Sequence, residues 1–422
     1  MMRSSNWGLW LALVALFLLV LPCACNEDED ETSTDGDQDT AGEQNEQMEQ
    51  ETDNKQAGSC AIPFADQDDY GPYSVGAMSV TFQDAAKGRA EAITGTIWYP
   101  ATVKDGTPYK YQGLIKSDHA LKDVALADAG PFPLIVFSHG YQGFAEQSFF
   151  FTEFMASHGF IVAACDHIGN TTGTNDEEHM GHMVQQRPQD LSIMIDQMLK
   201  DNADSSNRFY GKVDASRIAA VGHSFGGFTV LYLASGFIAP ELTEEQCSLP
   251  ADQRPVACLL VKLEQLSQID MDLDVSDKRV KAILPMAGVG MGIFGQANFD
   301  RITIPVMVMV GDDDKTVPYD QQSAVYYQVL DTDKAYFLMH HAGHFTFSNM
   351  CYVAPQMGDG CGQDYLEFDR ASYLINRYAL SFLRYELCGD MRDAAELRFE
   401  VSKSFSEITY EESLGLPEDG QK

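Results

Sequence analysis

The sequence predicts an α/β fold with a mostly parallel, doubly wound sheet, helices on both faces and an insertion after a central helix. Two observations support this class. Short continuous apolar runs, typical of strands buried on both faces, alternate with segments of helical period. One such run, Ile218 to Val221, ends in the sharp turn Gly222-His223-Ser224-Phe225-Gly226 and leads into an apolar helix. Strands that alternate with helices usually form a parallel sheet covered on both sides.

The predicted elements follow this rhythm along the chain. Strands are expected over residues 73–82, 92–99, 132–137, 160–165, 218–221, 279–284, 304–310 and 335–339. Helices are expected over residues 147–157, 188–200, 228–234, 321–329 and 366–385. The first two strands alternate in polarity and are expected to form an antiparallel hairpin at a sheet edge. Pro188 is expected to open its helix, because proline fits the first helical turn.

Two polar stretches interrupt the pattern. Residues 104–128 are expected to form an irregular surface excursion. Residues 238–276 form the insertion after the central helix, and they are either a lid over the functional site or a plain surface excursion.

The chain is strongly acidic. Its 422 residues carry a formal net charge of −35, and 45% of them are hydrophobic, which is enough for a large core. The charge excludes nucleic acid as a partner, because it would repel the phosphates.

The first residues predict export. Residues 1–25 combine a basic start at Arg3 with a short apolar stretch, which is typical of a secretory signal peptide. The ending Leu21-Pro22-Cys23-Ala24-Cys25 resembles a bacterial lipobox, in which Cys25 would be lipidated, although Pro22 departs from the usual residue. The protein is therefore expected either to be lipid-anchored in the bacterial cell envelope or to be secreted after cleavage.

The remaining chain divides by composition. Residues 26–58 are almost all polar or acidic and have no aromatic residue, so they predict a disordered acidic linker. Residues 59–395 are expected to form the folded domain. Residues 396–422 are expected to be a polar C-terminal tail. The sequence does not predict where this tail lies in the fold.

Seven cysteines follow Cys25. Export permits disulfides. The pairings that we expect are Cys247 with Cys258, Cys351 with Cys361, and Cys60 with Cys388. Cys165 ends an apolar strand and is expected to be a buried thiol outside any disulfide.

The turn around Ser224 has the form G-x-S-x-G. Between a strand and a helix, this pattern is typical of a nucleophile elbow. Gly222 and Gly226 flank the serine because side chains there would collide with the neighbouring strand and helix. The hydroxyl would stand at the carboxyl end of the sheet, above a helix N-terminus that favours developing negative charge. Because the pattern also arises by chance in a chain with 34 glycines, it needs an acid and a base at other strand ends.

Two later strand ends provide them. The strand over 304–310 is followed by Asp312, Asp313 and Asp314, and the last strand by His340, His341 and His344. A serine hydroxyl needs a base to take its proton, imidazole can do this near neutral pH, and a carboxylate orients the imidazole. The pattern G-x-x-D-x-x-V-P selects Asp314, with its two neighbours as alternatives. His344 is favoured because it follows the flexible pair Ala342-Gly343.

Other strand ends suggest supporting groups. The backbone amides of Tyr141 and Phe225 are expected to form an oxyanion hole. The alternative for the loop around Tyr141 is an ordinary turn. His167, Arg187 and Asp190 either touch substrate or pair locally to anchor a loop or a helix start.

The motifs together resemble the α/β-hydrolase superfamily, and within it the dienelactone-hydrolase-like and platelet-activating-factor-acetylhydrolase-like group. The resemblance spans residues 70–387 and is carried mainly by Trp98-Tyr99-Pro100, Phe137-Ser138-His139-Gly140-Tyr141, Gly222-His223-Ser224-Phe225-Gly226-Gly227 and Ala342-Gly343-His344-Phe345. It implies an α/β-hydrolase fold and carboxylic ester hydrolysis through an acyl-enzyme, without a cofactor. No metal ligand is predicted, and the sequence leaves any metal site open.

Two departures refine the resemblance. In the acetylhydrolases the acid follows the strand after the elbow strand, but here residues 285–290 contain no carboxylate. The acid is therefore expected one strand later, at Asp314, as in cutinase-like polyesterases, which the chain also resembles. Dienelactone hydrolases use a cysteine nucleophile, and Ser224 excludes that version.

The sequence thus predicts an exported serine hydrolase that cleaves small or polymeric carboxylic esters, with acetylhydrolase and polyesterase activity both open. The alternatives are a peptidase or thioesterase on the same three residues, or a non-catalytic envelope lipoprotein with a hydrolase fold. We expect a monomer that meets the membrane only through an N-terminal lipid anchor.

Overall fold

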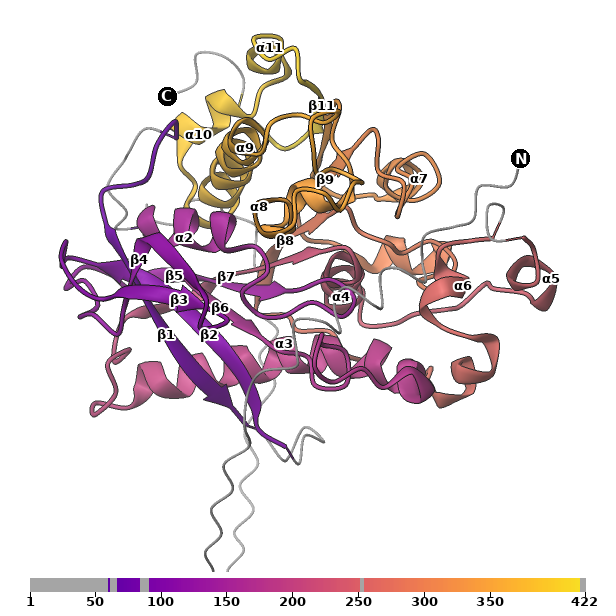
Figure 1. Cartoon of the computed structure of the whole chain (residues 1–422), viewed down its shortest axis with the longest axis horizontal. Helices are drawn as coiled ribbons and strands as arrows, with labels where there is room; N and C mark the ends of the chain where they lie inside the picture. Colours follow the sequence, from indigo (N-terminus) through magenta and orange to yellow (C-terminus); the bar gives the residue numbers. More distant parts are fainter. Residues whose placement is uncertain (1–59, 61–66, 84–90, 251–253, 418–422) are drawn as a thin grey trace, which may run out of the picture. The chain divides into compact units, whose positions relative to one another are not determined.

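A central β-sheet organises the residues that the computed structural model describes, which are residues 60, 67–83, 91–250 and 254–417. These residues belong to the unit Ala57–Lys422. The sheet has 11 strands in the order β11-β10-β9-β8-β7-β5-β6-β2-β1-β4-β3 (Figure 1). The strands are β1 (Ser74–Phe82), β2 (Ile93–Ala101), β3 (Pro108–Tyr111), β4 (Ile115–Lys122), β5 (Phe132–Ser138), β6 (Ile161–Cys165), β7 (Val213–His223), β8 (Val280–Met286), β9 (Val306–Gly311), β10 (Lys334–Met339) and β11 (Ile408–Ser413).

The middle of the sheet is parallel, as the sequence predicts. Strand β5 pairs in parallel with β6 and β7, and the parallel pairing continues through β8, β9 and β10. Strand β2 pairs antiparallel with both β1 and β6. With helices on both faces, this arrangement is an α/β-hydrolase fold.

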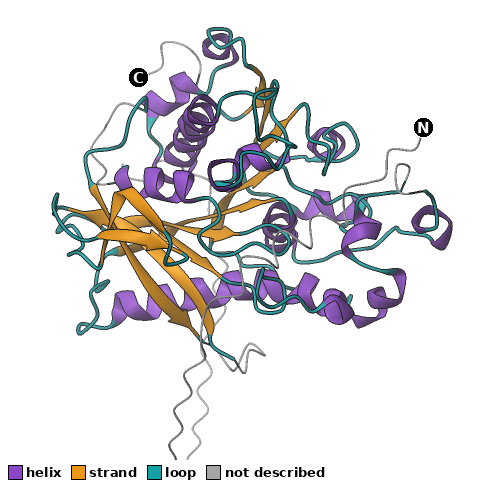
Figure 2. Cartoon of the chain, in the orientation of Figure 1, coloured by secondary structure: helices purple, strands orange, loops and turns teal. Residues whose placement is uncertain are grey.

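Each face of the sheet has its own hydrophobic core. Successive residues of a strand point to opposite faces, so Val136 of β5 joins one core and Phe137 joins the other. The first core includes helices α3 (Met180–Ala203) and α4 (Phe225–Ser235), and the second includes α2 (Phe149–Ser157) and α9 (Phe368–Cys388). Figure 2 shows these helices on either side of the strands.

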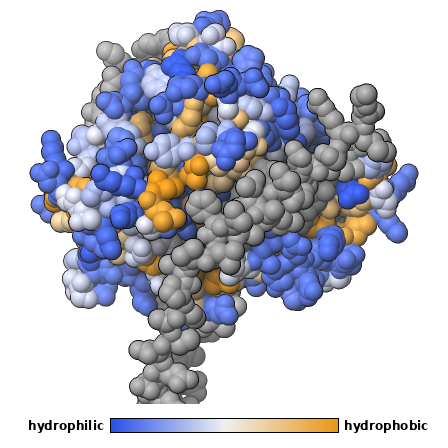
Figure 3. All heavy atoms as spheres, in the orientation of Figure 1, coloured by the Kyte–Doolittle hydropathy of each residue, from blue (hydrophilic) through white to orange (hydrophobic). Residues whose placement is uncertain are grey.

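Shorter helices complete the described residues. They are η2 (Glu177–His179), α5 (Glu244–Cys247), α6 (Ala257–Leu260), η3 (Leu263–Gln268), η4 (Gln296–Arg301), α7 (Ser323–Val329), η5 (His344–Phe347), α8 (Met350–Val353), α10 (Met391–Glu396) and α11 (Phe399–Ser402). Among the described helices, none combines the length and the hydropathy that crossing a membrane requires. On the face drawn in Figure 3, hydrophilic residues cover most of the described surface.

The stretch 104–128 differs from the expected irregular excursion. It contains the antiparallel hairpin of β3 and β4, and β4 pairs with β1. The hairpin of β1 and β2 therefore does not lie at the edge of the sheet, which is a correction to the prediction. These outer strands bury only a few side chains, such as Tyr109 and Tyr111, so their sequences look polar overall.

Helix α3 also differs from its prediction. It begins at Met180, two turns before Pro188, and the proline lies inside the helix. Proline lacks the N–H that would bond to the fourth preceding carbonyl, so a sequence rule places it in the first turn. Buried Met183 and Val184 extend the apolar face of the helix in front of Pro188 and hold the earlier turns in place.

The segment after Glu396 completes one edge of the sheet. Strand β11 pairs antiparallel with β10. Its residues Ile408 and Tyr410 are buried, while Thr409 between them and Glu411 after them are exposed. This alternation is the signal of a strand with one face in solvent, although six residues in a polar context make it weak.

The structure contains the three expected disulfides, which are Cys60–Cys388, Cys247–Cys258 and Cys351–Cys361. Cys165 is buried and lies outside any disulfide, also as expected. Such bonds form and persist in oxidising compartments, which supports an extracellular protein. The predicted signal peptide, the predicted linker over 26–58 and Cys25, the predicted lipidation site, lie outside the described residues.

We predict that replacing both cysteines of the longest disulfide, Cys60→Ser with Cys388→Ser, lowers the free energy of unfolding by about 2–5 kcal/mol. The bond closes a loop with a sequence separation of 328 residues, so its loss returns much chain entropy to the unfolded state. Guanidinium unfolding measures the change. The matched control, Cys247→Ser with Cys258→Ser, opens a separation of only 11 residues and should cost less. Equal losses for the two pairs would contradict the prediction.

Candidate active site

The turn at Ser224 joins β7 to α4 in a strained conformation. Ser224 has φ 57° and ψ −117°, in the region that favours glycine. A non-glycine residue held there costs on the order of 1–3 kcal/mol, and such strain is typical of functional sites. The backbone N–H of Ser224 donates to the carbonyl of Met286 at the end of β8, 2.8 Å away, which fixes the turn to the neighbouring strand.

The two flanking glycines permit the turn through close backbone contacts. A Cβ on Gly222 would lie 2.2 Å from the carbonyl oxygen of Gly226. A Cβ on Gly226 would lie 1.9 Å from the carbonyl oxygen of Ser138, at the end of β5. Both distances are far below contact distance, so only glycine fits at these positions. The helix can therefore begin directly against the loop that follows β5.

The structure brings Ser224, His344 and Asp314 into one chain of hydrogen bonds. Ser224 Oγ lies 2.8 Å from His344 Nε2, and His344 Nδ1 lies 2.8 Å from Asp314 Oδ2. Ser224 follows the end of β7, His344 follows the end of β10, and Asp314 follows the end of β9. Ser224, His344 and Asp314 are 8%, 3% and 5% exposed, respectively. The hydrogen bonds between them therefore lie in a nearly dry environment, where electrostatic interactions are strong.

The alternative acids and bases lie elsewhere. Asp312 Oδ2 pairs with His340 Nδ1 at 2.8 Å. Asp313 Oδ2 lies 3.3 Å from Lys315 Nζ, and His341 is exposed. Of the residues that the sequence leaves open, Asp314 and His344 are therefore the ones that form the chain with Ser224.

Burial and charge act in opposite directions on His344. Burial disfavours the imidazolium, but the charge and hydrogen bond of Asp314 and the charge of Asp359 outweigh it, so the pKa of His344 lies above its ordinary value of 6.5. Burial raises the pKa of the Asp314 carboxyl, and the charge of His344 opposes that shift. Asp314 Oδ1 also accepts backbone N–H groups from Thr316 and Val317 at 3.0 and 2.6 Å, which fix its orientation.

His223 and Gln147 connect the histidine to the loop after β5. His223 Nε2 lies 2.9 Å from the carbonyl oxygen of His344, and His223 Nδ1 lies 2.8 Å from Gln147 Nε2. The amide nitrogen can only donate, so Nε2 of His223 carries the proton and donates to His344. Burial and then the charge of His344 lower the pKa of His223 to about 3, which keeps it neutral. Gln147 Oε1 accepts the N–H of Gly140 at 3.0 Å.

Sequence reasoning missed both of these supporting residues. His223 occupies the first variable position of G-x-S-x-G, directly before the serine, and this position is the sequence signal that could have indicated its supporting role. Gln147 has no motif of its own.

The two residues expected to form the oxyanion hole flank the serine. Phe225 is the first residue of α4, where backbone N–H groups have no partner within the helix. A Cβ on Gly140 would lie 3.3 Å from Ser224 Cβ, so the loop that carries Tyr141 passes directly beside the serine. The ring of Tyr141 lies 6.4 Å from the ring of Phe225. Their role in holding an oxyanion stays a prediction.

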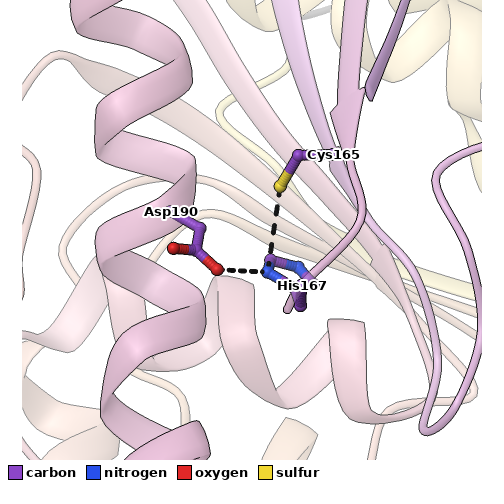
Figure 4. A group of neighbouring side chains, drawn as sticks. All are labelled: Cys165, His167 and Asp190. Atoms are coloured by element: carbon purple, nitrogen blue, oxygen red, sulfur yellow. Dashed lines mark hydrogen bonds and ion pairs between the residues drawn. The ribbon is translucent and has the colours of Figure 1, made fainter. Parts of the chain in front are cut away.

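A buried polar cluster supports the loop after β5. His167 Nδ1 lies 2.8 Å from Asp190 Oδ2 (Figure 4), and Nε2 lies 2.9 Å from Ser138 Oγ. The guanidinium of Arg187 donates to Ser138 Oγ and to the carbonyl of His139, and it lies 4.6 Å over the ring of Phe225. Burial lowers the pKa of Arg187 to about 9. Of the two roles open for His167, Arg187 and Asp190, these contacts favour anchoring the loop.

Cys165, His167 and Asp190 offer ligand atoms within 4.8 Å of one another (Figure 4). Their donor types are those of a transition-metal site. The Nδ1 atom of His167 is engaged by Asp190, however, and the buried charge of Arg187 interacts with both Cys165 and Asp190. A divalent cation would be repelled by that guanidinium, so these residues do not fit a metal ion.

The insertion over 238–276 contains α5, α6 and η3 and lies against the start of α3. Gln268 bonds to the carbonyl of Glu178 and to the N–H of Gly181, at 2.9 and 3.1 Å. Gln185 of α3 accepts the N–H of Asp270 at 2.8 Å. These contacts attach the segment to the domain, and both interpretations from the sequence, a lid and a plain surface excursion, stay open.

Comparisons with known proteins agree with this architecture. Cutinase est1 of Thermobifida alba is 30% identical to the chain over 213 residues, which are 50% of this chain and 53% of the relative. Cutinase cut1 of Thermobifida fusca is 26% identical over the same length, with 49% of the relative covered. The platelet-activating factor acetylhydrolase of Canis lupus familiaris is 28% identical over 225 residues, which are 39% of this chain and 51% of the relative.

The chain therefore spans about half the length of these curated relatives. Both groups of relatives were expected from the motifs around the serine, the acid and the histidine. The family described as Chlorophyllase matches residues 115–397, which is more than half of the chain and includes every residue of the hydrogen-bonded chain above. The protein thus belongs to the chlorophyllase family of α/β-hydrolases.

Proposed function

We propose that the protein is a serine-dependent hydrolase of carboxylic esters that works through an acyl-enzyme. The observation that supports this most strongly is the continuous hydrogen-bonded chain from Ser224 through His344 to Asp314. The names of the relatives, cutinase and acetylhydrolase, support an ester as the substrate.

In the proposed first half-reaction, Ser224 Oγ attacks the ester carbonyl carbon while His344 Nε2 takes the hydroxyl proton. Asp314 holds the imidazole by Nδ1 and stabilises the imidazolium. The amides of Tyr141 and Phe225 donate to the oxyanion of the tetrahedral intermediate. The carbon–oxygen bond to the alcohol then breaks, and the alcohol leaves with the proton from His344.

In the second half-reaction, water replaces the alcohol. The water oxygen attacks the acyl carbon while His344 takes a proton from the water. The bond between the acyl carbon and Ser224 Oγ then breaks, His344 returns the proton to Ser224 Oγ, and the carboxylic acid leaves. All of these steps use side chains and amides of the described residues.

The position of the acid bears on the substrate. Asp314 follows β9, one strand after the place that acetylhydrolases use. This supports a general or polyester-type esterase over a dedicated acetylhydrolase of phospholipids. Hydrolysis of thioesters or peptides on the same residues is the competing activity, and a panel of ester, thioester and peptide substrates of matched acyl length would distinguish them.

We further propose that the protein is exported as a monomer and lipid-anchored through Cys25. The three disulfides support export. Metabolic labelling with a fatty-acid analogue, with Cys25→Ala as the control, would test the anchor.

We predict that Ser224→Ala lowers kcat for a short-chain p-nitrophenyl ester by about a thousandfold or more, because no other group can form the acyl-enzyme. Circular dichroism and the unfolding midpoint should match those of the parent protein. Ser216→Ala is the matched control, because Ser216 is an exposed serine on the same strand, β7. Undiminished turnover by Ser224→Ala would contradict the proposal, and failure of a fluorophosphonate to label the parent protein would instead favour a non-catalytic binding protein.

The protonation of His344 predicts the acidic limb of the pH profile. The imidazole must be neutral to take the serine proton, and its pKa is raised above 6.5. We therefore expect kcat/KM to fall about tenfold per pH unit below an apparent pKa that lies above 6.5. His340→Gln removes a histidine that is not hydrogen-bonded to Ser224, His344 or Asp314. It should therefore leave this acidic limb unchanged. A limb centred below 6.5 would contradict the prediction.

A further inference from the structure

Asp359 lies in the loop that the Cys351–Cys361 disulfide closes, between α8 and α9. It is half-buried and has φ 48°, in the left-handed region that aspartate tolerates better than most residues. Neither the motifs nor the proposed mechanism uses it. Its backbone and side chain nevertheless contact the loops that carry the histidine and the acid.

Asp359 holds the start of the histidine loop through two acceptors. Its Oδ1 atom accepts the backbone N–H of His344 at 3.1 Å. Its backbone carbonyl accepts the N–H of Phe345 at 2.9 Å. The backbone of the general base is therefore fixed from one side by Asp359 and from the other by His223.

The same carboxylate holds the acid loop. Oδ1 also accepts the backbone N–H of Lys315 at 2.9 Å, and Oδ2 accepts the hydroxyl of Thr316. These two residues directly follow Asp314, whose own Oδ1 accepts the N–H of Thr316. One side chain thus connects the backbone at His344 to the backbone beside Asp314.

The contact between the two loops is close. A Cβ on Gly343 would lie 2.3 Å from the carbonyl carbon of Asp359 and 2.3 Å from the nitrogen of Gly360. Only glycine fits there, so the disulfide-closed loop packs directly against the residue before His344. The disulfide shortens the free length of this loop and so restricts where Asp359 can lie.

Asp359 also adds a second negative charge near the imidazole. Among the described residues, the ionisable groups that face His344 are Asp314, Asp359 and the neutral His223. Burial lowers the pKa of His344, and the charges of Asp314 and then Asp359 raise it. A residue that only filled space would have no such effect on the imidazole.

We propose that Asp359 is a positioning residue, which fixes the loop of His344 against the loop of Asp314 and is itself held in place by the Cys351–Cys361 disulfide. This inference rests on the proposed ester hydrolysis for its kinetic consequences. Its electrostatic consequence can be measured without any substrate.

Two substitutions separate the geometry from the charge. Asp359→Ala removes every hydrogen bond that the Asp359 side chain makes to the two loops. Asp359→Asn keeps an oxygen that can accept the N–H groups of His344 and Lys315. Its amide NH₂ then faces the hydroxyl of Thr316, and this hydroxyl can accept a hydrogen bond as well as donate one. The asparagine therefore keeps the connection and loses only the charge.

We expect Asp359→Ala to lower kcat for a p-nitrophenyl ester by about tenfold to a hundredfold with KM little changed, because misplacing the base slows the chemical step. Asp359→Asn should keep most of kcat but shift the acidic limb of kcat/KM to lower pH by roughly half a unit. The double variant Cys351→Ser with Cys361→Ser should lower kcat in the same direction as Asp359→Ala, by a smaller factor.

The control is Asp313→Asn. Asp313 is exposed on the acid loop and pairs with Lys315, so the substitution removes the same charge without touching His344. It should change neither kcat nor the acidic limb. Unfolding midpoints of all variants distinguish a loss of activity from a loss of folded protein.

Titration of the His344 imidazole by NMR, assigned with His344→Gln, tests the inference independently of turnover. Asp359→Asn should lower its midpoint by roughly half a unit, and Asp313→Asn should not. If the parent protein hydrolyses no ester, the proposed function fails and this titration alone decides the role of Asp359. An unchanged midpoint in Asp359→Asn, or an unchanged kcat in folded Asp359→Ala, would overturn the proposal.

Discussion

The strained backbone of Ser224 is the constraint on which the rest of the site depends. A φ of 57° persists at a serine only when the surroundings permit no relaxed alternative. Here β8 holds the serine N–H, and Gly222 and Gly226 let the strand, the turn and the loop after β5 approach within backbone contact. The central position of β7 in the sheet follows from the same need, because neighbours on both sides must hold the turn.

Buried polar side chains hold the loops around Ser224 in the positions that this strained turn requires. Arg187 fixes the carbonyl of His139, Gln147 fixes the N–H of Gly140, and His223 fixes the carbonyl of His344. Burying such groups is costly unless they are bonded, and each of these bonds ends on the backbone of a loop at the site. The same hydrogen bonds that satisfy these buried polar groups therefore also fix the positions of the loops around Ser224 and His344.

The sequence indicates the parts of this design that are local or periodic. Strands such as β5 and β9 are buried on both faces, so continuous apolar runs predict them, and the serine, acid and histidine follow such runs directly. Strands β4 and β11 lie near or at the edges and bury few residues, which hides them among polar neighbours. Gln147 bonds to His223, 76 positions away, and Asp359 bonds to Lys315, 44 positions away, and no short pattern predicts such contacts.

The bond between Cys60 and Cys388 also determines how the domain would carry a mechanical load. The disulfide joins two points with a sequence separation of 328 residues, and Ser224, Asp314 and His344 all lie between them. Tension between the two ends of the chain passes directly across this covalent link. The segment between the cysteines is thereby shielded from stretching, and only the residues outside it, including α10, α11 and β11, can be drawn out while the disulfide is intact.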